Sequence, residues 1–127
     1  MAAADIAELD QARYISFATY RVNGAEVATP VWFAAADGRL YVFTAEQSGK
    51  VKRLRHSQRA RVAPSDARGR VRGEWRAASA HILTEPRSIE RAHAALLAKY
   101  GWQLRVTNVL SRLTGRINHR AWLEIRL

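Results

Sequence analysis

The hydrophobic pattern at the start of the chain predicts an antiparallel meander. Residues 14–21, YISFATYR, are dominated by β-branched and aromatic side chains and predict a strand. Asn23-Gly24 follows, a dipeptide that favours a two-residue hairpin turn because both positions tolerate positive φ. The next strand, residues 26–36, ends at a second such dipeptide, Asp37-Gly38, and residues 39–45 form a third strand.

Helical spacing of apolar residues replaces this pattern in four segments. Ser48 can cap a helix in which Val51 and Leu54 share one face, and Gly101 and Gly115 can end two later helices. The predicted helices cover residues 5–12, 49–58, 88–100 and 102–114.

Three further segments read as strands: residues 61–63, 71–84 and 117–127. Gly73 inside the second of them indicates a bulge or a close approach of another backbone. Six strands with inserted helices and no βαβ alternation predict one mainly β domain over residues 1–127. We expect a closed or nearly closed six-stranded antiparallel barrel with peripheral helices.

Charge is concentrated in one part of the chain. The chain has 21 Lys and Arg residues against 11 Asp and Glu, a net charge of +10. Residues 48–72 hold nine of these cations and the single acid Asp66, so most of the excess charge lies there. This segment is therefore expected to face an anionic partner.

The sequence lacks the residues and motifs that several classes of catalytic and metal-binding site require. The chain has no cysteine, which excludes disulfides, thiolate nucleophiles and cysteine-based metal sites. The four histidines have no metal-ligand spacing, no paired carboxylates stand out, and no GxGxxG, P-loop or HExxH motif occurs. We therefore predict no catalytic side chain and no metal site, so that a cofactor would have to supply any reactive atom.

The N-terminal segment and the length of the apolar runs indicate where in the cell the protein is expected to lie. The first residues, MAAADIAELDQ, carry acids where a signal peptide has basic residues, and no apolar run reaches the roughly 20 residues that span a bilayer. We expect a cytoplasmic protein without a membrane partner.

Residues 43–55, FTAEQSGKVKRLR, have the composition of a phosphate site. A strand ends at Thr44, and a helix begins at Ser48 with Gly49 and Lys50 in its first turn, so free amides, hydroxyls and an ammonium group converge. The alternative is that Ser48 only caps the helix and that the cations form a solvated helix face. The density of positive charge favours the phosphate site.

Taken together, these segments resemble a known family. The segments YISFATYRVNG, ATPVWFAAADGRLYVFTAEQSGKVKRLRHSQRARVAPSD and RGEWRAASAHIL are similar to those of the flavin and deazaflavin split β-barrel proteins, which include the pyridoxamine 5′-phosphate oxidase-like proteins. The strongest likeness is to the branch of actinobacterial reductases that use coenzyme F420. Arginine outnumbers lysine 18 to 3, which suggests a GC-rich genome and is consistent with an actinobacterium.

The resemblance implies a Greek-key split barrel that forms a homodimer, with cofactor sites between the subunits. Pro30, Val31 and Trp32 match positions that line the ring system of the cofactor, and Trp75 matches a contact from the partner subunit. The residues that match phosphate-binding positions are Thr44, Ser48, Gly49, Lys50 and Arg53. Core packing alone would also explain Trp32 and Trp75.

The resemblance and the charge together predict an oxidoreductase that transfers a hydride between reduced F420 and a small electron-poor organic substrate. F420 carries a phosphodiester and several glutamates, and the arginines between Arg55 and Arg72 could form an extended groove for that tail. The alternatives are an FMN-binding protein, a non-catalytic cofactor carrier and, less favoured, a basic nucleic-acid binder. The chain lacks the C-terminal arginine and histidine pattern of the pyridoxal-forming oxidases.

Overall fold

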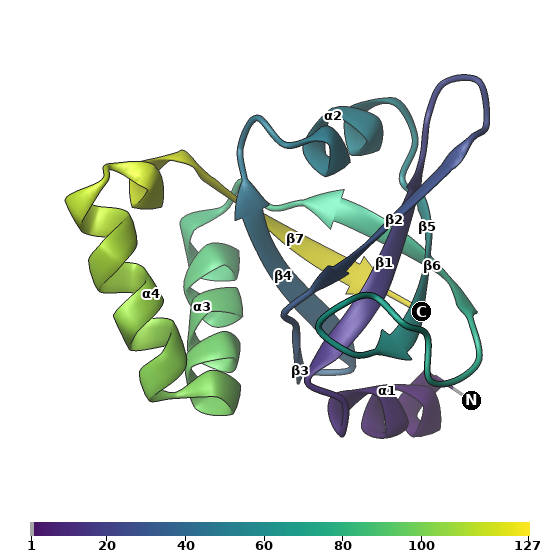
Figure 1. Cartoon of the computed structure of the whole chain (residues 1–127), viewed down its shortest axis with the longest axis horizontal. Helices are drawn as coiled ribbons and strands as arrows, with labels where there is room; N and C mark the ends of the chain where they lie inside the picture. The colour runs from purple at the N-terminus through teal and green to yellow at the C-terminus, as the bar shows by residue number, and fades with distance from the viewer. Residues whose placement is uncertain (1) are drawn as a thin grey trace.

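A seven-stranded antiparallel sheet forms the body of the computed structural model, which describes residues 2–127 (Figure 1). The elements in chain order are α1 (Ala2–Asp10), β1 (Tyr14–Tyr20), β2 (Glu26–Val31), β3 (Ala34–Ala36), β4 (Arg39–Ala45), α2 (Gly49–His56), β5 (Arg59–Ser65), β6 (Arg76–Ile82), α3 (Pro86–Tyr100), α4 (Trp102–Leu113), the 3-10 helix η1 (Arg116–His119) and β7 (Arg120–Arg126).

The sheet is nearly closed on itself. Its strand order is β2-β1-β5-β6-β7-β4-β3, so β2 and β3 are the two edges. These edge strands are consecutive in the chain and are separated only by Trp32 and Phe33. Because so short a link cannot span an open sheet, the two edges must meet there, and the sheet curls into a barrel. The prediction of a mainly β, nearly closed antiparallel sheet is confirmed.

The prediction of six strands is wrong, because the run 26–36 forms two strands. β2 pairs with β1 from Glu26 to Val31, whereas β3 pairs with β4 at the opposite edge of the sheet. The chain therefore changes its pairing partner at Trp32 and Phe33, which belong to neither strand. No local signal marks this change, since the residues on both sides have strand-forming character.

Other strands differ in length from the prediction, and the one predicted over residues 61–63 extends over Arg59–Ser65 as β5. The predicted strand 71–84 contributes only β6, and Val71 forms a single bridge to Ser65. Gly73 lies against β5, because a Cβ at this position would come within 2.8 Å of Pro64 Cγ. The close backbone approach predicted from Gly73 is confirmed, and the loop that it belongs to folds over the end of β5 instead of extending β6.

The two turn dipeptides form different turns. Asp37 and Gly38 both have positive φ, 53° and 75°, and make the expected two-residue turn. Around Asn23, only Gly24 has positive φ, and the Gly24 N–H donates to the Arg21 carbonyl at 2.8 Å while the Arg21 N–H donates to Ala25. This pattern is a three-residue loop in which Gly24 takes the left-handed position. The predicted hairpin is present with a different turn.

Apolar side chains from the inner face of the sheet and from two helices form the barrel interior. α1 and α2 close opposite ends of the barrel, the lower and upper ends in Figure 1. Buried residues of this interior are Ile6, Leu9, Ile15, Phe17, Phe33, Leu40, Val42, Leu54, Ala60, Val62, Ala80, Leu123 and Ile125. The alternation along each strand therefore places one face of every central strand in this core.

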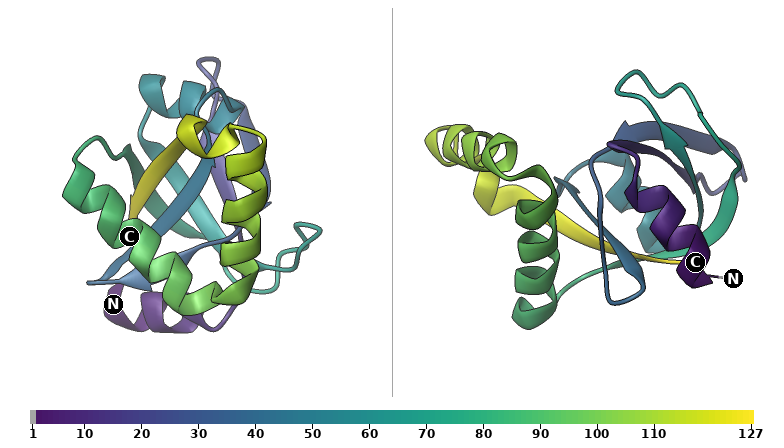
Figure 2. Two further views of the ribbon diagram at one scale, coloured as in Figure 1. Left: turned by 90° about the vertical axis from the view of Figure 1, so that its left-hand side faces the viewer. Right: turned by 90° about the horizontal axis from the view of Figure 1, so that it is seen from below.

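A second apolar layer lies outside the barrel, where α3 covers β3, β4 and β7 (Figure 2). Its buried members are Ala34, Tyr41, Ala92, Leu96, Tyr100, Leu104 and Trp122. α4 packs mainly on α3 and η1 and stands away from the barrel. None of the helices within residues 2–127 has the length and apolar character needed to cross a membrane.

Helix ends follow the predicted signals closely. Ser48 caps α2 through a hydrogen bond that its Oγ accepts from the Val51 N–H, and Gly101 with φ 55° separates α3 from α4. α1 overlaps the predicted range 5–12 but begins three residues earlier, at Ala2, and ends two residues earlier, at Asp10. The last strand begins at Arg120, three residues later than predicted, because residues 116–119 form η1.

Tyr100 holds the link between the two sheet edges. Its hydroxyl accepts a hydrogen bond from the Phe33 N–H at 2.9 Å and lies 2.8 Å from the carbonyl oxygens of Phe33 and Arg13, either of which can accept its proton. Its ring stacks on Trp32 with 4.6 Å between centroids. Burial raises the pKa of the hydroxyl to about 12, so it remains a donor at neutral pH.

We predict that Tyr100→Phe lowers the free energy of unfolding by about 1–3 kcal/mol, because the buried Phe33 N–H loses its partner. Chemical denaturation followed by circular dichroism measures the loss. Tyr14→Phe is the matched control, since the Tyr14 hydroxyl makes no side-chain hydrogen bond within residues 2–127. Equal stability of both variants and the wild type would show that the link does not depend on this hydroxyl.

Candidate functional site

Two unpaired strand edges begin at the Trp32–Phe33 link and diverge from it. β3 pairs with β4 only between Arg39 and Tyr41, so β4 from residue 42 onward has a free edge on that side. β2 is the first strand of the sheet, so its outer edge is also free. Pro30 suits this position because it has no N–H to donate to a neighbouring strand. Figure 1 shows β2 and β4 separating from the link, with α2 between their upper ends in this view. We call this region the split.

The start of α2 gathers four of the predicted phosphate-binding residues. Ser48 is the cap residue, and Gly49, Lys50 and Arg53 lie within the first five positions of the helix. Because the first amides of a helix lack intrahelical partners, this end attracts negative charge. The Ser48 hydroxyl is already committed to capping, at 3.4 Å from the Val51 N–H. The capping interpretation of Ser48 is therefore correct, and it does not account for the neighbouring cations.

Arg53 is fixed over the first turn of the helix. Its Nε donates to Thr19 Oγ1 at 2.6 Å, which anchors the side chain to β1. A Cβ on Gly49 would lie 2.6 Å from Arg53 Nη1, so the guanidinium occupies the space that any larger residue would fill. The two terminal nitrogens make no hydrogen bond within the described residues. They remain available to an anion.

Lys50 and Arg53 are half-buried cations without a counter-charge. Burial lowers the pKa of Lys50, and the charge of Arg53 lowers it further. Burial and the charge of Arg21 likewise lower the pKa of Arg53. Within residues 2–127, no carboxylate forms an ion pair with any of the three. An anion placed among them would relieve this repulsion, so the residues present fit a phosphate group.

The other predicted residues surround the split at different positions. Pro30 and Val31 lie on the free edge of β2, and Trp32 lies in the link, half-buried against Tyr100. Thr44 lies near the end of β4 and lines a separate cavity with residues of α4 and η1. Trp75 lies below the guanidinium of Arg61, at 4.1 Å, on the outer face of β5 and β6. Within one chain, Trp75 is therefore not joined to the cluster at α2.

The basic segment does not form one groove, contrary to expectation. Arg61 forms a two-point ion pair with Glu26, at 2.7 and 2.8 Å, and Arg72 pairs with Asp66 at 3.3 Å. Arg59 lies over the ring of Tyr20. These contacts distribute the arginines between Arg55 and Arg72 over α2, the outer face of β5 and the loop beyond it. Lys50 and Arg53 are the half-buried cations of this segment that form no ion pair within residues 2–127.

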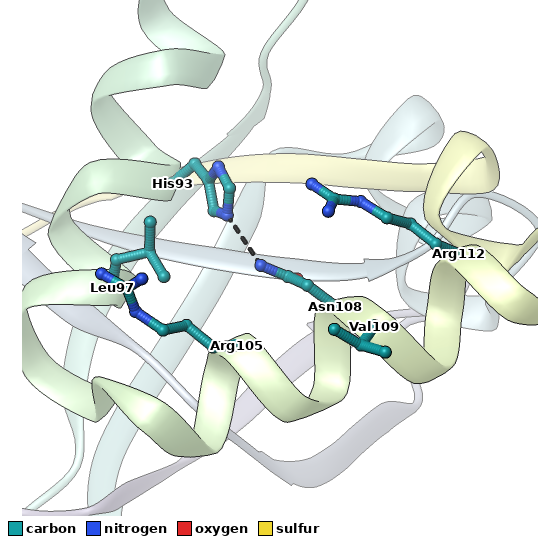
Figure 3. Close-up of a pocket in the computed structure, with 6 residues that line it drawn as sticks. All are labelled: His93, Leu97, Arg105, Asn108, Val109 and Arg112. Atoms are coloured by element: carbon teal, nitrogen blue, oxygen red, sulfur yellow. Dashed lines mark hydrogen bonds between the residues drawn. The ribbon is translucent and has the colours of Figure 1, made fainter.

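A hollow between α3 and α4 has its own polar floor (Figure 3). It measures about 330 Å³, and its lining is His93, Leu97, Arg105, Asn108, Val109 and Arg112. His93 Nε2 lies 3.1 Å from Asn108 Nδ2. Burial lowers the pKa of His93, and the charges of Arg120 and Arg112 add to this effect, so the ring is neutral at pH 7. None of the predicted site residues lines this hollow.

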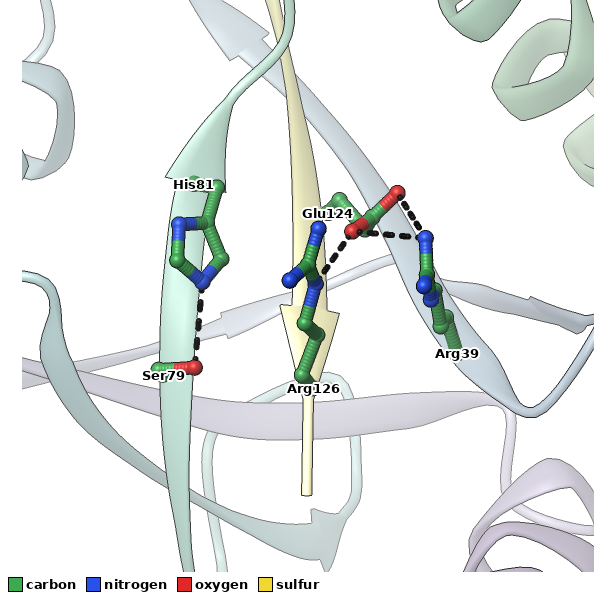
Figure 4. Close-up of polar contacts among 5 residues, drawn as sticks. All are labelled: Arg39, Ser79, His81, Glu124 and Arg126. Carbon is green, nitrogen blue, oxygen red and sulfur yellow. Dashed lines mark hydrogen bonds and ion pairs between the residues drawn. The ribbon is translucent and has the colours of Figure 1, made fainter.

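A buried carboxylate on the outer face of the sheet is fully compensated (Figure 4). Glu124 receives hydrogen bonds from Arg126 Nε at 2.7 Å and from Arg39 Nη1 at 3.2 Å. Burial alone would raise the pKa of Glu124, but the contacts with Arg126 and Arg39 hold it below its usual value. Nearby His81 contacts Ser79. This cluster is a structural ion triad, since its only acid is already paired.

Within residues 2–127, no group of three His, Asp or Glu side chains could hold a metal ion.

Sequence reasoning missed Thr19 and Arg21 as members of the cluster at α2. Thr19 reads as one more residue of a predicted strand, and only the packing of α2 against β1 brings its hydroxyl to Arg53. Arg21 follows the same strand and reaches the cluster from the hairpin. The one available signal was the alternation of β1, which places Thr19 on the same face as Phe17.

Solved structures with this fold include several split-barrel proteins. A conserved hypothetical protein of Mycobacterium tuberculosis has a TM-score of 0.69 and 23% identity, over 98% of this chain and 79% of that one. The heme storage protein HutZ of Vibrio cholerae has a TM-score of 0.70 and 13% identity, over 97% and 87%. A Listeria innocua protein described as a candidate pyridoxamine 5′-phosphate oxidase has a TM-score of 0.63 and 11% identity, over 98% and 90%.

These likenesses show a common fold. The chain has the split-barrel architecture of the pyridoxamine 5′-phosphate oxidase-like proteins. The sequence matches no protein-family model and no curated protein.

We predict that Glu124→Gln removes part of the pH dependence of stability in the acid range. The folded protein holds the pKa of Glu124 below the usual 4.5, so the ionised carboxylate stabilises the fold above that pH. This stabilisation is lost as the pH falls through the lower, folded-state pKa. Thermal unfolding between pH 7 and pH 3 should show a lower Tm for the variant at pH 7 and a smaller gap to the wild type at pH 3. Glu90→Gln, an exposed change on α3, should follow the wild type. A constant gap across the range would contradict the assignment.

Proposed function

We propose that this protein is an F420-dependent oxidoreductase that transfers a hydride between reduced F420 and a small electron-poor organic substrate. The observation that carries the proposal is the half-buried pair Lys50 and Arg53, which lies where α2 begins beside the split and forms no ion pair with any described carboxylate of residues 2–127. A binder of a phosphorylated cofactor requires such a pair, whereas a purely structural helix end does not.

This chain's residues would hold the cofactor in two ways. Lys50, Arg53 and the free amides at the start of α2 would bind its phosphate, while the free edge of β2 at Pro30 and Val31 would lie along its ring system. When bound, reduced F420 supplies a hydride. The protein's part is to orient the ring and exclude water, and an apolar wall such as Trp32 suits this task.

The choice of F420 over FMN rests on charge around the α2 cluster. Arg21 acts on Arg53 electrostatically, and Arg55 lies on the exposed surface of the same helix. Neither forms an ion pair within residues 2–127. These two arginines extend the positive surface beyond one phosphate pocket. A cofactor that continues into a tail of carboxylates would use them, while FMN ends at its phosphate.

A homodimer belongs to the same proposal, because the cofactor cleft of the resembling family is shared by two subunits. The exposed face of α4 supports it. Four apolar side chains at helical spacing point away from the protein, with Trp102 71% and Leu113 79% exposed, and with Val106 and Leu110 between them. Contiguous apolar surface of this kind marks an interaction site.

A non-catalytic cofactor carrier is the second candidate. The likeness to a heme storage protein of Vibrio cholerae favours it. Titration of the purified protein with F420, FMN and heme separates binding from turnover, and consumption of reduced F420 in the presence of an electron-poor acceptor identifies the oxidoreductase. Binding without turnover of any acceptor would favour the carrier.

We predict that Lys50→Ala weakens F420 binding roughly 10- to 150-fold, the loss expected for a charge-assisted hydrogen bond. Fluorescence titration measures the affinity. Lys52→Ala is the matched control, because Lys52 is exposed on another face of the same helix. Equal losses in the two variants would indicate binding by diffuse charge and would contradict the pocket at α2.

We predict that the protein elutes in gel filtration as a dimer of about 29 kDa, twice the chain mass of 14.3 kDa. Leu110→Ser combined with Leu113→Ser should shift it to the monomer, since both side chains are exposed in the single chain and their loss leaves the core intact. Val22→Ser, at an exposed hairpin position, should remain dimeric. A monomeric wild type would remove the basis for a shared cleft.

A further inference from the structure

A cavity of about 340 Å³ lies between the end of β4 and the segment formed by α4, η1 and the start of β7. Its lining combines an aromatic wall, hydroxyl groups and positive charge: Phe43, Thr44, Ala45, Thr107, Ser111, Arg116, His119 and Arg120. We call it the β4–α4 pocket. Thr44 and Ala45 lie at the end of β4, whose free edge bounds the split, so a ligand in the pocket would lie beside the split.

Arg120 is held rigidly in the pocket wall. Its Nη1 donates to Asn108 Oδ1 at 2.6 Å and its Nη2 donates to Ser111 Oγ at 2.9 Å. The guanidinium carbon lies 4.4 Å from the centroid of the Phe43 ring. Both hydrogen-bond acceptors are neutral, so these contacts orient the guanidinium without neutralising its charge.

The side chain of Asn108, which accepts a hydrogen bond from Arg120, is itself oriented by His93. A guanidinium can only donate, so the atom of Asn108 that faces Arg120 is its carbonyl oxygen. The amide nitrogen of Asn108 therefore faces His93 Nε2 and donates to it, as the contact in Figure 3 shows. This requires a neutral His93 protonated on Nδ1, which agrees with its lowered pKa. The chain His93, Asn108, Arg120 is thus a preorganised support for one charged group.

Positive charge around the pocket is not compensated. Residues 101–120 contain four arginines and neither Asp nor Glu. Burial and the charge of Arg112 lower the pKa of Arg120, the direction expected of a cation that lacks an anion. Glu46 is close by, since its N–H donates to the His119 carbonyl, but its carboxylate forms no ion pair with Arg116 or Arg120 within residues 2–127.

We propose that the β4–α4 pocket binds the carboxylate of an aromatic or unsaturated organic acid, and that such acids are the substrate class of the enzyme. The fork of Arg120 and the charge of Arg116 receive the carboxylate, and Phe43 and Ala45 contact the apolar body. The proposal that the pocket binds a carboxylate depends only on the geometry and charge of its lining residues. Its assignment to the substrate rests on the proposed function, through the position of Thr44.

Benzoate and its neutral analogue benzamide test the carboxylate site directly. Saturation-transfer NMR and calorimetry on the full chain without cofactor should show benzoate binding at least about tenfold tighter than benzamide. Arg116→Gln, an exposed change, should weaken benzoate binding about tenfold, and Arg120→Met should abolish it. Arg87→Gln, an exposed change at the start of α3, should leave it unaltered. Equal binding of benzoate and benzamide, or benzoate binding unaffected by both pocket variants, would overturn the proposal.

Competition with the coenzyme separates the two sources of a carboxylate. If F420 displaces benzoate while its tail-free deazaflavin core does not, the pocket receives the glutamate tail, which overturns the substrate assignment. If benzoate and F420 bind together, the substrate assignment is supported. Failure of the proposed function has a different signature, because F420 would then not bind while benzoate binding and its dependence on Arg116 would persist.

Discussion

The Tyr100 hydroxyl fixes the place where the two edges of the sheet meet, and the geometry of the split depends on this contact. One hydroxyl from α3 contacts both the N–H and the carbonyl oxygen of Phe33, and its ring stacks on Trp32. The chain can therefore leave β2, cross to the opposite edge and enter β3 without a buried backbone group losing its partner. Without that anchor, the link between β2 and β3 would lose the contacts that hold the two sheet edges together at this point.

Local signals predicted the elements, whereas the contacts between elements were not visible in the sequence. The cap at Ser48, the turn at Asp37-Gly38 and the boundary at Gly101 each depend on one or two residues, and all three are present. The break at Trp32 and Phe33 depends on pairing with β4, which lies elsewhere in the chain. For the same reason, the sequence showed the cations of α2 but not the anchoring of Arg53 by Thr19.

Net charge alone was a weak guide to the site, because some cations of the basic segment are neutralised by ion pairs and others are not. Arg61 is paired with Glu26, and Arg72 is paired with Asp66. Lys50 and Arg53 lie partly out of water and form no ion pair with the described residues 2–127, which concentrates their field at the start of α2. The residues that matter to an anion are those where burial and missing compensation coincide. Neither property can be read from composition.

The position of α3, α4 and η1 in the chain has a consequence for how this fold can diversify. β6 and β7 are neighbours in the sheet, with Ile82 paired to Leu123, yet all three helical elements are inserted between them. The insertion leaves and re-enters the barrel at nearly the same place, so its length and composition can change without altering strand order or register. The cluster at α2 is built on the barrel, whereas four of the eight residues lining the β4–α4 pocket come from the insertion. Evolution can therefore exchange the chemistry that the pocket recognises while the scaffold beside it stays constant.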